Sequence, residues 1–432
     1  MIFNKKNKVA FFTLGCKLNF AETSTIARSF EEKGFQRVSF DKKADIYVIN
    51  SCSVTESANK KSRQAIKKAI KKSPDSLIAV IGCYAQLKPD ELAKIQGVDI
   101  ILCEKEKFNL IKYIENIEKQ EVTQIQTCEV ENIEHFEPAF SFGDRTRSFL
   151  KVQDGCDYKC SYCTIPLARG KSRNDNIQKT IEQAEKISEQ GIKEIILTGV
   201  NIGDFGKSTN ESFYDLITEL NKVENIERYR ISSIEPNLLT DEIIEFVSES
   251  RKFAPHFHIP LQSGSDKILG LMQRQYKREL FEHRIKKIKS LMPYAAIGVD
   301  VIVGFPGETE FDFIDTYQFL EKLDISYLHV FSYSERENTK AVEIKGKVKQ
   351  ADITYRSKKM HFLSNKKKNQ FYTKNLNTKR AVLFEAYNSN GKMYGFTDNY
   401  IKIETNFNKK ITNKILLVKL KEISYSGNVQ IY

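Results

Sequence analysis

The first hundred residues alternate between short apolar runs and longer amphipathic stretches. Three apolar, β-branched runs end at or just before a cysteine and read VAFFTLGC, ADIYVINSC and SLIAVIGC. A helical pattern follows each run, over residues 20–33, 57–72 and 89–96, and VDIILC at 98–103 is typical of a fourth strand. Strands alternating with helices predict an α/β unit with a parallel sheet. We assign this unit to residues 1–118.

Residues 146–365 show the same alternation on a larger scale. The strand candidates are SFLKVQDG, EIILTGVN, RYRISSI, HFHIPLQ, AIGVDVIVGF and SYLHVFSY. Helical patterns lie between them, for example at 177–189, 241–248 and 310–323. Six βα units predict a partial (β/α)6 version of the (β/α)8 barrel, in which active sites lie at the carboxyl ends of the strands. Residues 119–145 lack periodicity and are interpreted as a linker.

The last part of the chain, residues 371–432, has a different pattern. Short alternating segments such as AVLFEAYNSN, MYGFTDNYIKIE and ILLVKLKEISYS are separated by turn signals, and no helical pattern is convincing. This predicts a small antiparallel β-barrel that resembles the TRAM domain, an OB-like RNA-binding module. Its aromatic residues would be shared between the barrel core and a bound RNA: Phe384, Tyr387, Tyr394, Phe396 and Tyr400.

Charge is distributed unevenly along the 432 residues. The net charge is +12, and residues 361–432 contribute +9 of it, from 13 basic and 4 acidic side chains. A concentration of basic charge indicates contact with a polyanion, although a solvated lysine-rich surface is the alternative. No apolar run reaches the roughly 18 to 20 residues of a membrane helix, and the amino terminus does not resemble a signal peptide. We expect no membrane partner.

Three cysteines in the run QDGCDYKCSYC carry the clearest chemical signal. Cys156, Cys160 and Cys163 form a Cys-x3-Cys-x2-Cys triplet without a fourth cysteine nearby. Three thiolates can hold three irons of a [4Fe–4S] cube, whereas most electron-transfer clusters have four protein ligands. The open iron is then free to bind a reactant. A zinc site would need a fourth Cys or His, and none of the six histidines lies in this loop.

A second set of cysteines is far apart in sequence. Cys16, Cys52 and Cys83 each fall at the carboxyl end of a predicted strand, which is the edge where open α/β sheets bind ligands. We interpret them as a second three-cysteine cluster site; three buried structural thiols are the alternative. Cys103 and Cys128 are given no role. Reduced cysteines and oxygen-sensitive clusters favour a cytoplasmic location.

The cysteine motifs resemble those of a known family. The triplet at 156–163 is similar to that of the radical S-adenosylmethionine (SAM) superfamily. TLGCKLN, NSCSVT and GCYAQ resemble the three amino-terminal motifs of the radical-SAM methylthiotransferases. The resemblance implies an enzyme with two [4Fe–4S] clusters. SAM would bind the open iron of the first and give a 5′-deoxyadenosyl radical, and the second would handle the inserted sulfur.

The resemblance also implies several cofactor contacts. Tyr162, within the triplet, would lie near the bound nucleoside. Gly199 and Asn201, at the end of the second barrel strand, would approach the amino group of SAM, with a plain turn as the alternative.

Polar residues at other strand ends and a basic helix are further candidates. Gln262, with Ser263 and Gly264, is expected to face the cofactor or substrate just past the fourth strand. Arg169 is expected to meet the cofactor carboxylate or a substrate phosphate. The basic helix at 59–72 is most simply a solvated face.

The substrate expectation rests on the first two motifs. They look most like the branch that modifies N6-threonylcarbamoyladenosine at position 37 of tRNA. The alternatives are isopentenyladenosine tRNA and a ribosomal-protein aspartate, and a different class is a non-catalytic iron–sulfur RNA-binding protein. The expected partners are the tRNA anticodon loop and an electron donor such as a flavodoxin or ferredoxin, and the sulfur donor is left open.

Overall fold

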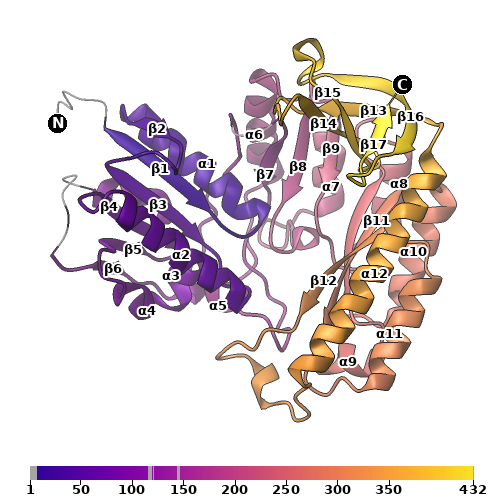
Figure 1. Ribbon diagram of the computed structural model, residues 1–432, viewed down its shortest axis with the longest axis horizontal. Helices are drawn as coiled ribbons and strands as arrows, with labels where there is room; N and C mark the ends of the chain where they lie inside the picture. The colour runs from indigo at the N-terminus through magenta and orange to yellow at the C-terminus, as the bar shows by residue number, and fades with distance from the viewer. Residues whose placement is uncertain (1–6, 115–118, 120, 144–145, 432) are drawn as a thin grey trace.

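The computed structural model describes residues 7–114, 119, 121–143 and 146–431 (Figure 1). The chain forms an amino-terminal α/β unit, a core with two parallel sheets and a closed carboxyl-terminal barrel, so the predicted fold class is confirmed. The proposed boundaries at residues 118 and 145 fall outside the described residues.

The amino-terminal unit is built on one parallel sheet of six strands. The strand order is β2-β1-β3-β4-β5-β6, and the strands are β1 (Lys8–Thr13), β2 (Gln36–Val38), β3 (Ile46–Ser51), β4 (Leu77–Gly82), β5 (Ile100–Leu102) and β6 (Gln124–Gln126). Every residue of β3 and β4 is buried, which explains their continuous apolar runs. β6 lies in the predicted linker, and a strand of three residues is too short to produce a visible period.

Helices cover both faces of this sheet (Figure 1). They are α1 (Lys17–Glu32), α2 (Glu56–Lys72), α3 (Cys83–Leu87), α4 (Pro89–Ala93) and the 3-10 turn η1 (Lys107–Tyr113). Thr55 caps α2, because its side chain accepts a hydrogen bond from the backbone N–H of Ala58. α1 begins three residues earlier than the pattern predicted, directly after Cys16.

The core contains six parallel strands in two sheets of three. They are β7 (Ser148–Lys151), β8 (Glu194–Thr198), β9 (Arg228–Ile231), β10 (His256–Gln262), β11 (Ala296–Val303) and β12 (Tyr327–Ser332). A parallel bridge between Ser233 and His258 joins the two sheets. The predicted open barrel therefore forms, with its strands in sequence order.

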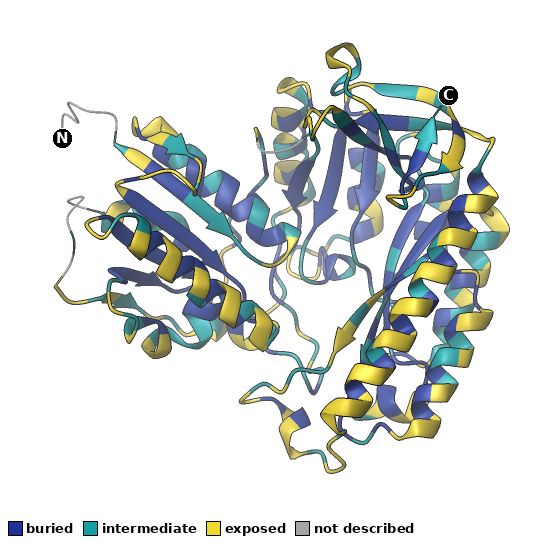
Figure 2. Cartoon of the chain, viewed as in Figure 1, coloured by how far each residue is buried: buried dark blue, intermediate teal, exposed yellow. Residues whose placement is uncertain are grey.

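Helices pack against the outside of this open barrel, and Figure 2 shows their buried faces turned inward. They are α6 (Ile177–Glu189), α7 (Phe213–Leu220), α8 (Asp241–Glu249), α10 (Arg278–Leu291) and α11 (Glu310–Lys322). Phe257 and Ile259 of β10 belong to the large apolar cluster between strands and helices. Because side chains alternate along a strand, His256 and His258 face the barrel interior. The short elements are α5 (Ile165–Arg169), α9 (Asp266–Leu271), η2 (Val130–Asn132), η3 (Ile202–Asp204) and η4 (Lys340–Glu343).

A long helix leads into the carboxyl-terminal barrel. α12 (Gln350–Asn375) runs beside β12 and crosses residue 371, where the sequence pattern placed the start of a helix-free region. The barrel closes in the order β13-β14-β15-β17-β16. Its elements are β13 (Lys379–Phe384), β14 (Lys392–Thr397), β15 (Lys402–Asn406), η5 (Lys409–Ile411), β16 (Ile415–Ile423) and β17 (Val429–Ile431).

Arginines of β9 attach the barrel to the core. Arg228 donates to the carbonyl of Ala381 at 2.9 Å, and Arg230 donates to the carbonyl of Asp398 at 3.0 Å. Both arginines also pair with the buried Glu194. Burial alone would raise the pKa of Glu194, but the neighbouring arginines hold it at about 2. Buried charged residues thus fix the position of the barrel on the core.

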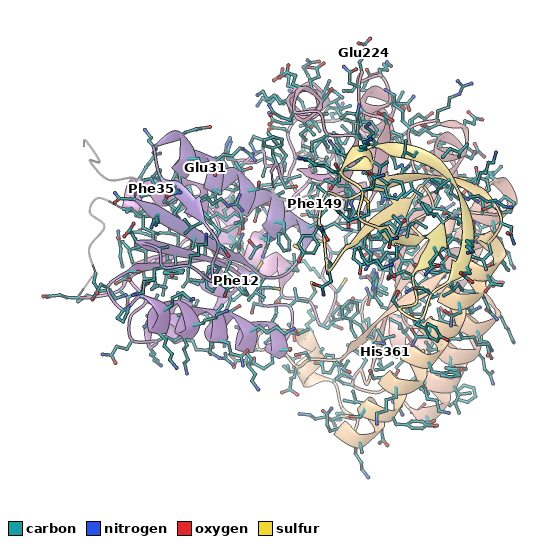
Figure 3. All side chains as sticks on the ribbon, turned by 45° about the horizontal axis from the view of Figure 1, so that its top comes forward. Phe12, Glu31, Phe35, Phe149, Glu224 and His361 are labelled. Carbon is teal, nitrogen blue, oxygen red and sulfur yellow. The ribbon has the colours of Figure 1, made fainter. Side chains whose placement is uncertain are left out.

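An apolar contact joins the amino-terminal unit to the core. Phe149 of β7 packs against Phe20 of α1, with ring centroids 6.5 Å apart, and Figure 3 shows Phe149 between the two parts. Ala21 and Ile196 belong to the same buried cluster.

Candidate active site

The contiguous cysteine triplet lies in the loop that follows β7. Cys156, Cys160 and Cys163 line a hollow of about 550 Å³. The backbone N–H groups of Tyr158 and Ile165 donate to the sulfurs of Cys156 and Cys163, each at 3.4 Å. Burial, reinforced by the other two thiols, raises the pKa of Cys156 to about 12. Cys160 also contributes to the raised pKa of Cys163, so the three thiols lie close together.

A glycine makes the turn into this loop. Gly155 has a φ of +66°, and a Cβ atom there would lie 1.9 Å from the carbonyl oxygen of Lys171. Any side chain would therefore displace the segment around Gly170 and Lys171, whose backbone accepts a hydrogen bond from Cys156.

The second set of cysteines is brought together by the sheet. Cys16, Cys52 and Cys83 follow β1, β3 and β4, which are neighbours in the sheet. A Cβ atom on Gly15, which has a φ of +100°, would lie 3.0 Å from the sulfur of Cys52. Burial raises the pKa of Cys83 to about 12, and Cys52 and Cys16 contribute to this rise. Cys16 is exposed, while the other two are buried.

The spacing of the thiols does not suit a single metal ion. Two sulfurs on one zinc ion lie within about 4.6 Å of each other, since each Zn–S bond is about 2.3 Å. Among the described residues, sets of three metal-ligating atoms all within 4.8 Å of one another occur at His258, Asp300 and His329 and at Glu22, Glu104 and Asp154. Neither set contains a cysteine. Neither triplet therefore places all three sulfurs as close together as one zinc ion would require.

Asn201 offers an open acceptor near the first triplet. Its amide nitrogen donates to Asp204 at 2.8 Å, while its buried Oδ1 has no hydrogen-bond partner within the described chain. Asp204 in turn raises the pKa of Cys156, which places this amide close to the thiols. A buried acceptor without a partner suits a donor group such as an amine.

Gly199 makes room for a neighbouring glutamine, and its contact with SAM stays a prediction. A Cβ atom there would lie 2.9 Å from both the carbonyl and the Oε1 atom of Gln153. The same Oε1 accepts hydrogen bonds from the backbone N–H groups of Val200 and Asn201. Gly199 therefore lets Gln153 hold the loop. Sequence reasoning missed Gln153 because one glutamine in SFLKVQDG carries no pattern.

Arg274 is a second residue that the sequence did not reveal. Its guanidinium donates to the sulfur of Cys160 at 3.2 Å and to the hydroxyl of Tyr162 at 3.5 Å, and it pairs with Glu235. Tyr162 also packs edge-on against Phe305, with ring centroids 6.2 Å apart. The sequence places Arg274 more than a hundred residues after Cys160, so only the fold joins them.

The polar loop after β10 is only partly as expected. Gln262 has a φ of +69° at a bulge in the strand. Ser263 and Gly264, however, bond to the hydroxyl of Thr316 on α11, at 3.2 Å and 3.0 Å. These two residues fasten the loop to the helix, and the contact of Gln262 with cofactor or substrate stays a prediction.

Arg169 does not reach a cofactor or phosphate as expected. It is 1% exposed, and its guanidinium donates to Glu22 and Asp154 at 2.9 Å and to the side-chain oxygen of Asn19 at 2.7 Å. The buried ionic cluster between the amino-terminal unit and the core comprises Glu22, Glu104, Lys107, Lys151, Asp154, Arg169 and Arg173. Arg169 therefore links the two parts of the chain.

Aromatic and imidazole side chains line the barrel interior. His256 bonds to the hydroxyl of Tyr327 at 2.8 Å, and His258 bonds to Asp300 at 2.6 Å. Tyr400 of the carboxyl-terminal barrel reaches this face, with its ring 4.4 Å from that of His256. The carboxyl-terminal barrel thus contributes a ring to the interior face of the open barrel.

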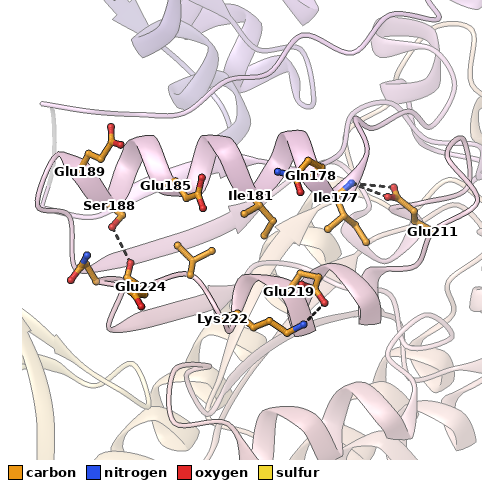
Figure 4. Close-up of a pocket in the computed structure, with 12 residues that line it drawn as sticks. Ile177, Gln178, Ile181, Glu185, Ser188, Glu189, Glu211, Glu219, Lys222 and Glu224 are labelled. Carbon is orange, nitrogen blue, oxygen red and sulfur yellow. Dashed lines mark hydrogen bonds and ion pairs between the residues drawn. The ribbon is translucent and has the colours of Figure 1, made fainter.

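A different hollow, of about 730 Å³, lies beside α6 and α7 (Figure 4). Its lining includes Glu185, Glu189, Glu211, Glu219 and Glu224, and none of the predicted site residues. This acidic surface is unsuited to a polyanion. Across the described ranges, no helix is both long enough and apolar enough to cross a membrane.

Comparisons with known proteins agree with this arrangement. The model of the uncharacterized protein family UPF0004 matches residues 8–103, and that of the radical SAM superfamily matches residues 150–320. Among solved structures, a radical S-adenosylmethionine methyltransferase, TsrM, from Kitasatospora setae has a TM-score of 0.53 at 14% identity. That likeness covers 76% of this chain and 75% of the other, and it supports the fold alone.

Curated relatives match nearly the whole chain. Threonylcarbamoyladenosine tRNA methylthiotransferase MtaB of Bacillus subtilis is 39% identical, over 97% of this chain and 95% of its own. The enzyme of the same name from Aquifex aeolicus is 39% identical, over 94% and 98%. A tRNA-2-methylthio-N(6)-dimethylallyladenosine synthase of Clostridium tetani is 32% identical, over 98% and 96%.

Proposed function

The chain belongs to the radical-SAM tRNA methylthiotransferase family, and from this membership we propose its reaction. A methylthio group is added at C2 of N6-threonylcarbamoyladenosine at position 37 of tRNA. The observation that carries the proposal is the near full-length likeness to relatives named for that nucleoside, at 34 to 39% identity. Because the family consists of enzymes, the alternative of a non-catalytic iron–sulfur RNA-binding protein is excluded.

The enzyme uses two [4Fe–4S] clusters and SAM. We assign the SAM-binding cluster to Cys156, Cys160 and Cys163, and the second cluster to the triplet at the sheet edge. When bound, these groups supply a 5′-deoxyadenosyl radical and a sulfur carrier. Radical chemistry is needed because the C2–H bond of the adenine is not acidic, so a base cannot remove its proton. The convergence of three thiols at each site and the open acceptor on Asn201 support this assignment.

Residues around the first triplet would orient the cofactors. The unpartnered Oδ1 of Asn201 is suited to accept from the amino group of SAM. Arg274 donates to the Cys160 sulfur, and a hydrogen bond to a cluster ligand influences the reduction potential. Tyr162 and Phe305 form an apolar wall that would keep water away from the nucleoside.

The substrate is a tRNA, and we propose that its anticodon loop enters between the three parts of the chain. Single-stranded bases are recognised by stacking on aromatic side chains, and the exposed ring of Tyr387 on the carboxyl-terminal barrel offers such a surface. Exposed lysines of the carboxyl-terminal barrel, such as Lys409 and Lys410, would contact phosphates. A flavodoxin or ferredoxin is proposed as electron donor, and the cytoplasm as location.

The substrate proposal is tested with two synthetic anticodon stem-loops, one bearing threonylcarbamoyladenosine and one bearing dimethylallyladenosine. Anaerobically reconstituted enzyme should convert the first to its 2-methylthio product, measured by mass analysis of digested nucleosides. Preferential conversion of the dimethylallyl RNA would instead support the reaction named for the Clostridium tetani relative.

A further inference from the structure

Three side chains that can ligate a metal converge on the interior face of the open barrel. They are His258, Asp300 and His329, and one ligand atom of each lies within 4.8 Å of those of the other two. The Nε2 atom of His258 is 2.6 Å from Oδ1 of Asp300, and the rings of the two histidines have centroids 5.0 Å apart. The proposed reaction gives none of these residues a task.

The sheet fixes this convergence. β10, β11 and β12 are neighbours in one sheet of the core, and each supplies one of the three residues. Asp300 and His329 are partners in the register of β11 and β12. Asp300 is also the partner of Pro260 on β10, two residues beyond His258. All three side chains therefore lie on one face, because side chains alternate along a strand. Residues on strands are held more precisely than residues on loops.

His329 has ring nitrogens available to a ligand. The residue is exposed, and no group of the described chain forms a hydrogen bond with either nitrogen. An ion with bonds of about 2.1 Å needs ligand atoms no more than about 4.2 Å apart. A small rotation of this imidazole, which no hydrogen bond restrains, is enough to complete the set.

A second cluster of the described chain has similar spacing but is already neutralised. Its three carboxylates also have ligand atoms within 4.8 Å of one another, and they belong to Glu22, Glu104 and Asp154. Arg169 pairs with all three. A cation of the chain itself thus occupies that cluster. Asp300, by contrast, forms no ion pair with a lysine or arginine within the described ranges.

We propose that His258, Asp300 and His329 bind one divalent first-row transition-metal ion, such as Mn²⁺, Fe²⁺ or Zn²⁺. Imidazole nitrogens favour these ions, whereas Ca²⁺ and Mg²⁺ prefer sets of oxygen atoms. Two histidines and one carboxylate hold an ion from one side and leave its other positions open. Those positions face the interior of the open barrel, away from the apolar cluster between strands and helices. The site uses no thiolate and is separate from both cysteine triplets.

Titration of the reconstituted holoenzyme with Mn²⁺ tests the site, because the clusters then occupy the predicted cysteine ligands. Free Mn²⁺ is measured by its EPR signal, and wild type should bind about one ion per chain. His329→Gln should weaken this binding about tenfold or more, since even the loss of a group that supports a ligand has an effect of this size. His361→Gln removes an exposed histidine of α12 outside the cluster and should bind like wild type.

A second variant, Asp300→Asn, keeps the shape of the side chain and should lower the affinity for Mn²⁺ to a similar extent. Pulsed EPR of the bound ion should show coupling to imidazole nitrogen in wild type and less of it in His329→Gln. The proposal is overturned if wild type binds no Mn²⁺ at millimolar concentration, or if both variants bind it as tightly as wild type. Bound Mn²⁺ without nitrogen coupling also overturns it, because carboxylates alone would then hold the ion.

Iron content is measured on every variant, so that loss of a cluster is not mistaken for loss of the Mn²⁺ site. No RNA takes part in these measurements. The metal site can therefore fail while the proposed function stands, and the reverse is also true.

Discussion

The two cysteine triplets occupy the same interface but are built in different ways. Cys156, Cys160 and Cys163 lie within one loop, and backbone N–H groups of that loop donate to two of the sulfurs. Cys16, Cys52 and Cys83 are separated by more than thirty residues from one to the next, and neighbouring strands bring them together. The first site depends on local geometry, whereas the second exists only when the parallel sheet is folded.

The buried ionic cluster connects the two cysteine triplets. Arg169 ends the short helix that follows Cys163, and it donates to Asn19, whose side-chain oxygen lies 3.8 Å from the sulfur of Cys16. Buried ion pairs contribute little net stability, but removing one partner is costly. The cluster is therefore suited to fixing the position of one triplet relative to the other.

The largest expected effect comes from removing the local triplet. Replacing its three cysteines together by Ala should halve the iron, from about eight to about four per chain, because each [4Fe–4S] cluster holds four irons. SAM cleavage should disappear. Iron analysis after anaerobic reconstitution measures the change, and loss of all iron, or of none, would show that the two sites are not independent.

The next effect concerns the connection between the sites. Arg169→Met leaves Glu22 and Asp154 short of a buried partner, so the free energy of unfolding should fall by about 3 to 5 kcal/mol. Arg278→Met removes a half-exposed pair with Asp315 and should cost no more than about 1 kcal/mol. Denaturant titrations under anaerobic conditions compare the two variants, and equal losses would contradict a special role for the cluster.

A similar buried charge fixes the carboxyl-terminal barrel. Glu194→Gln should destabilise the contact between barrel and core by about 3 kcal/mol, since the folded pKa is about 2 against an ordinary 4.5. A depressed carboxyl pKa stabilises the fold above pH 4.5, and this contribution is lost as the pH falls toward 2. The difference between variant and wild type should thus be constant from about pH 6 to pH 8. A difference that varies across this range would point to another group.

The smallest effect is expected at the two remaining cysteines. A hydrogen bond from Cys103 lowers the pKa of Cys128 to about 7, so Cys128 should react first with iodoacetamide at neutral pH. Cys128→Ala should nevertheless leave the iron content unchanged, because Cys128 belongs to neither triplet. A loss of iron in this variant would make it a ligand of the second site.

The sequence predicted most reliably the features that depend on the spacing of neighbouring residues. The Cys-x3-Cys-x2-Cys motif and the helix at Ile177–Glu189 follow from neighbouring residues, and the helix bounds are confirmed. The three-residue β6 and the continuation of α12 past residue 371 were missed, since tertiary contacts determine them. The cysteines remain predicted ligands.

Site residues that depend on distant contacts were not predictable in the same way. Arg169 is bonded to Glu22, which lies 147 positions away in the sequence. This buried carboxylate takes the place of the cofactor carboxylate or substrate phosphate that the sequence led us to expect. Arg274 reaches Cys160 across 114 positions. Neither residue stands in a repeating pattern, so only the folded structure identifies its partners.

The two triplets should perform separable tasks, and a single cysteine substitution in the second triplet separates them. Cys52→Ala enzyme is supplied with SAM, a reductant and prethreonylcarbamoylated tRNA, and both products are quantified in the same reaction. We expect 5′-deoxyadenosine to form at close to the wild-type level and the 2-methylthio nucleoside to be absent. Methylthiolation that survives this substitution, or SAM cleavage that is lost with it, would show that the two triplets do not act separately.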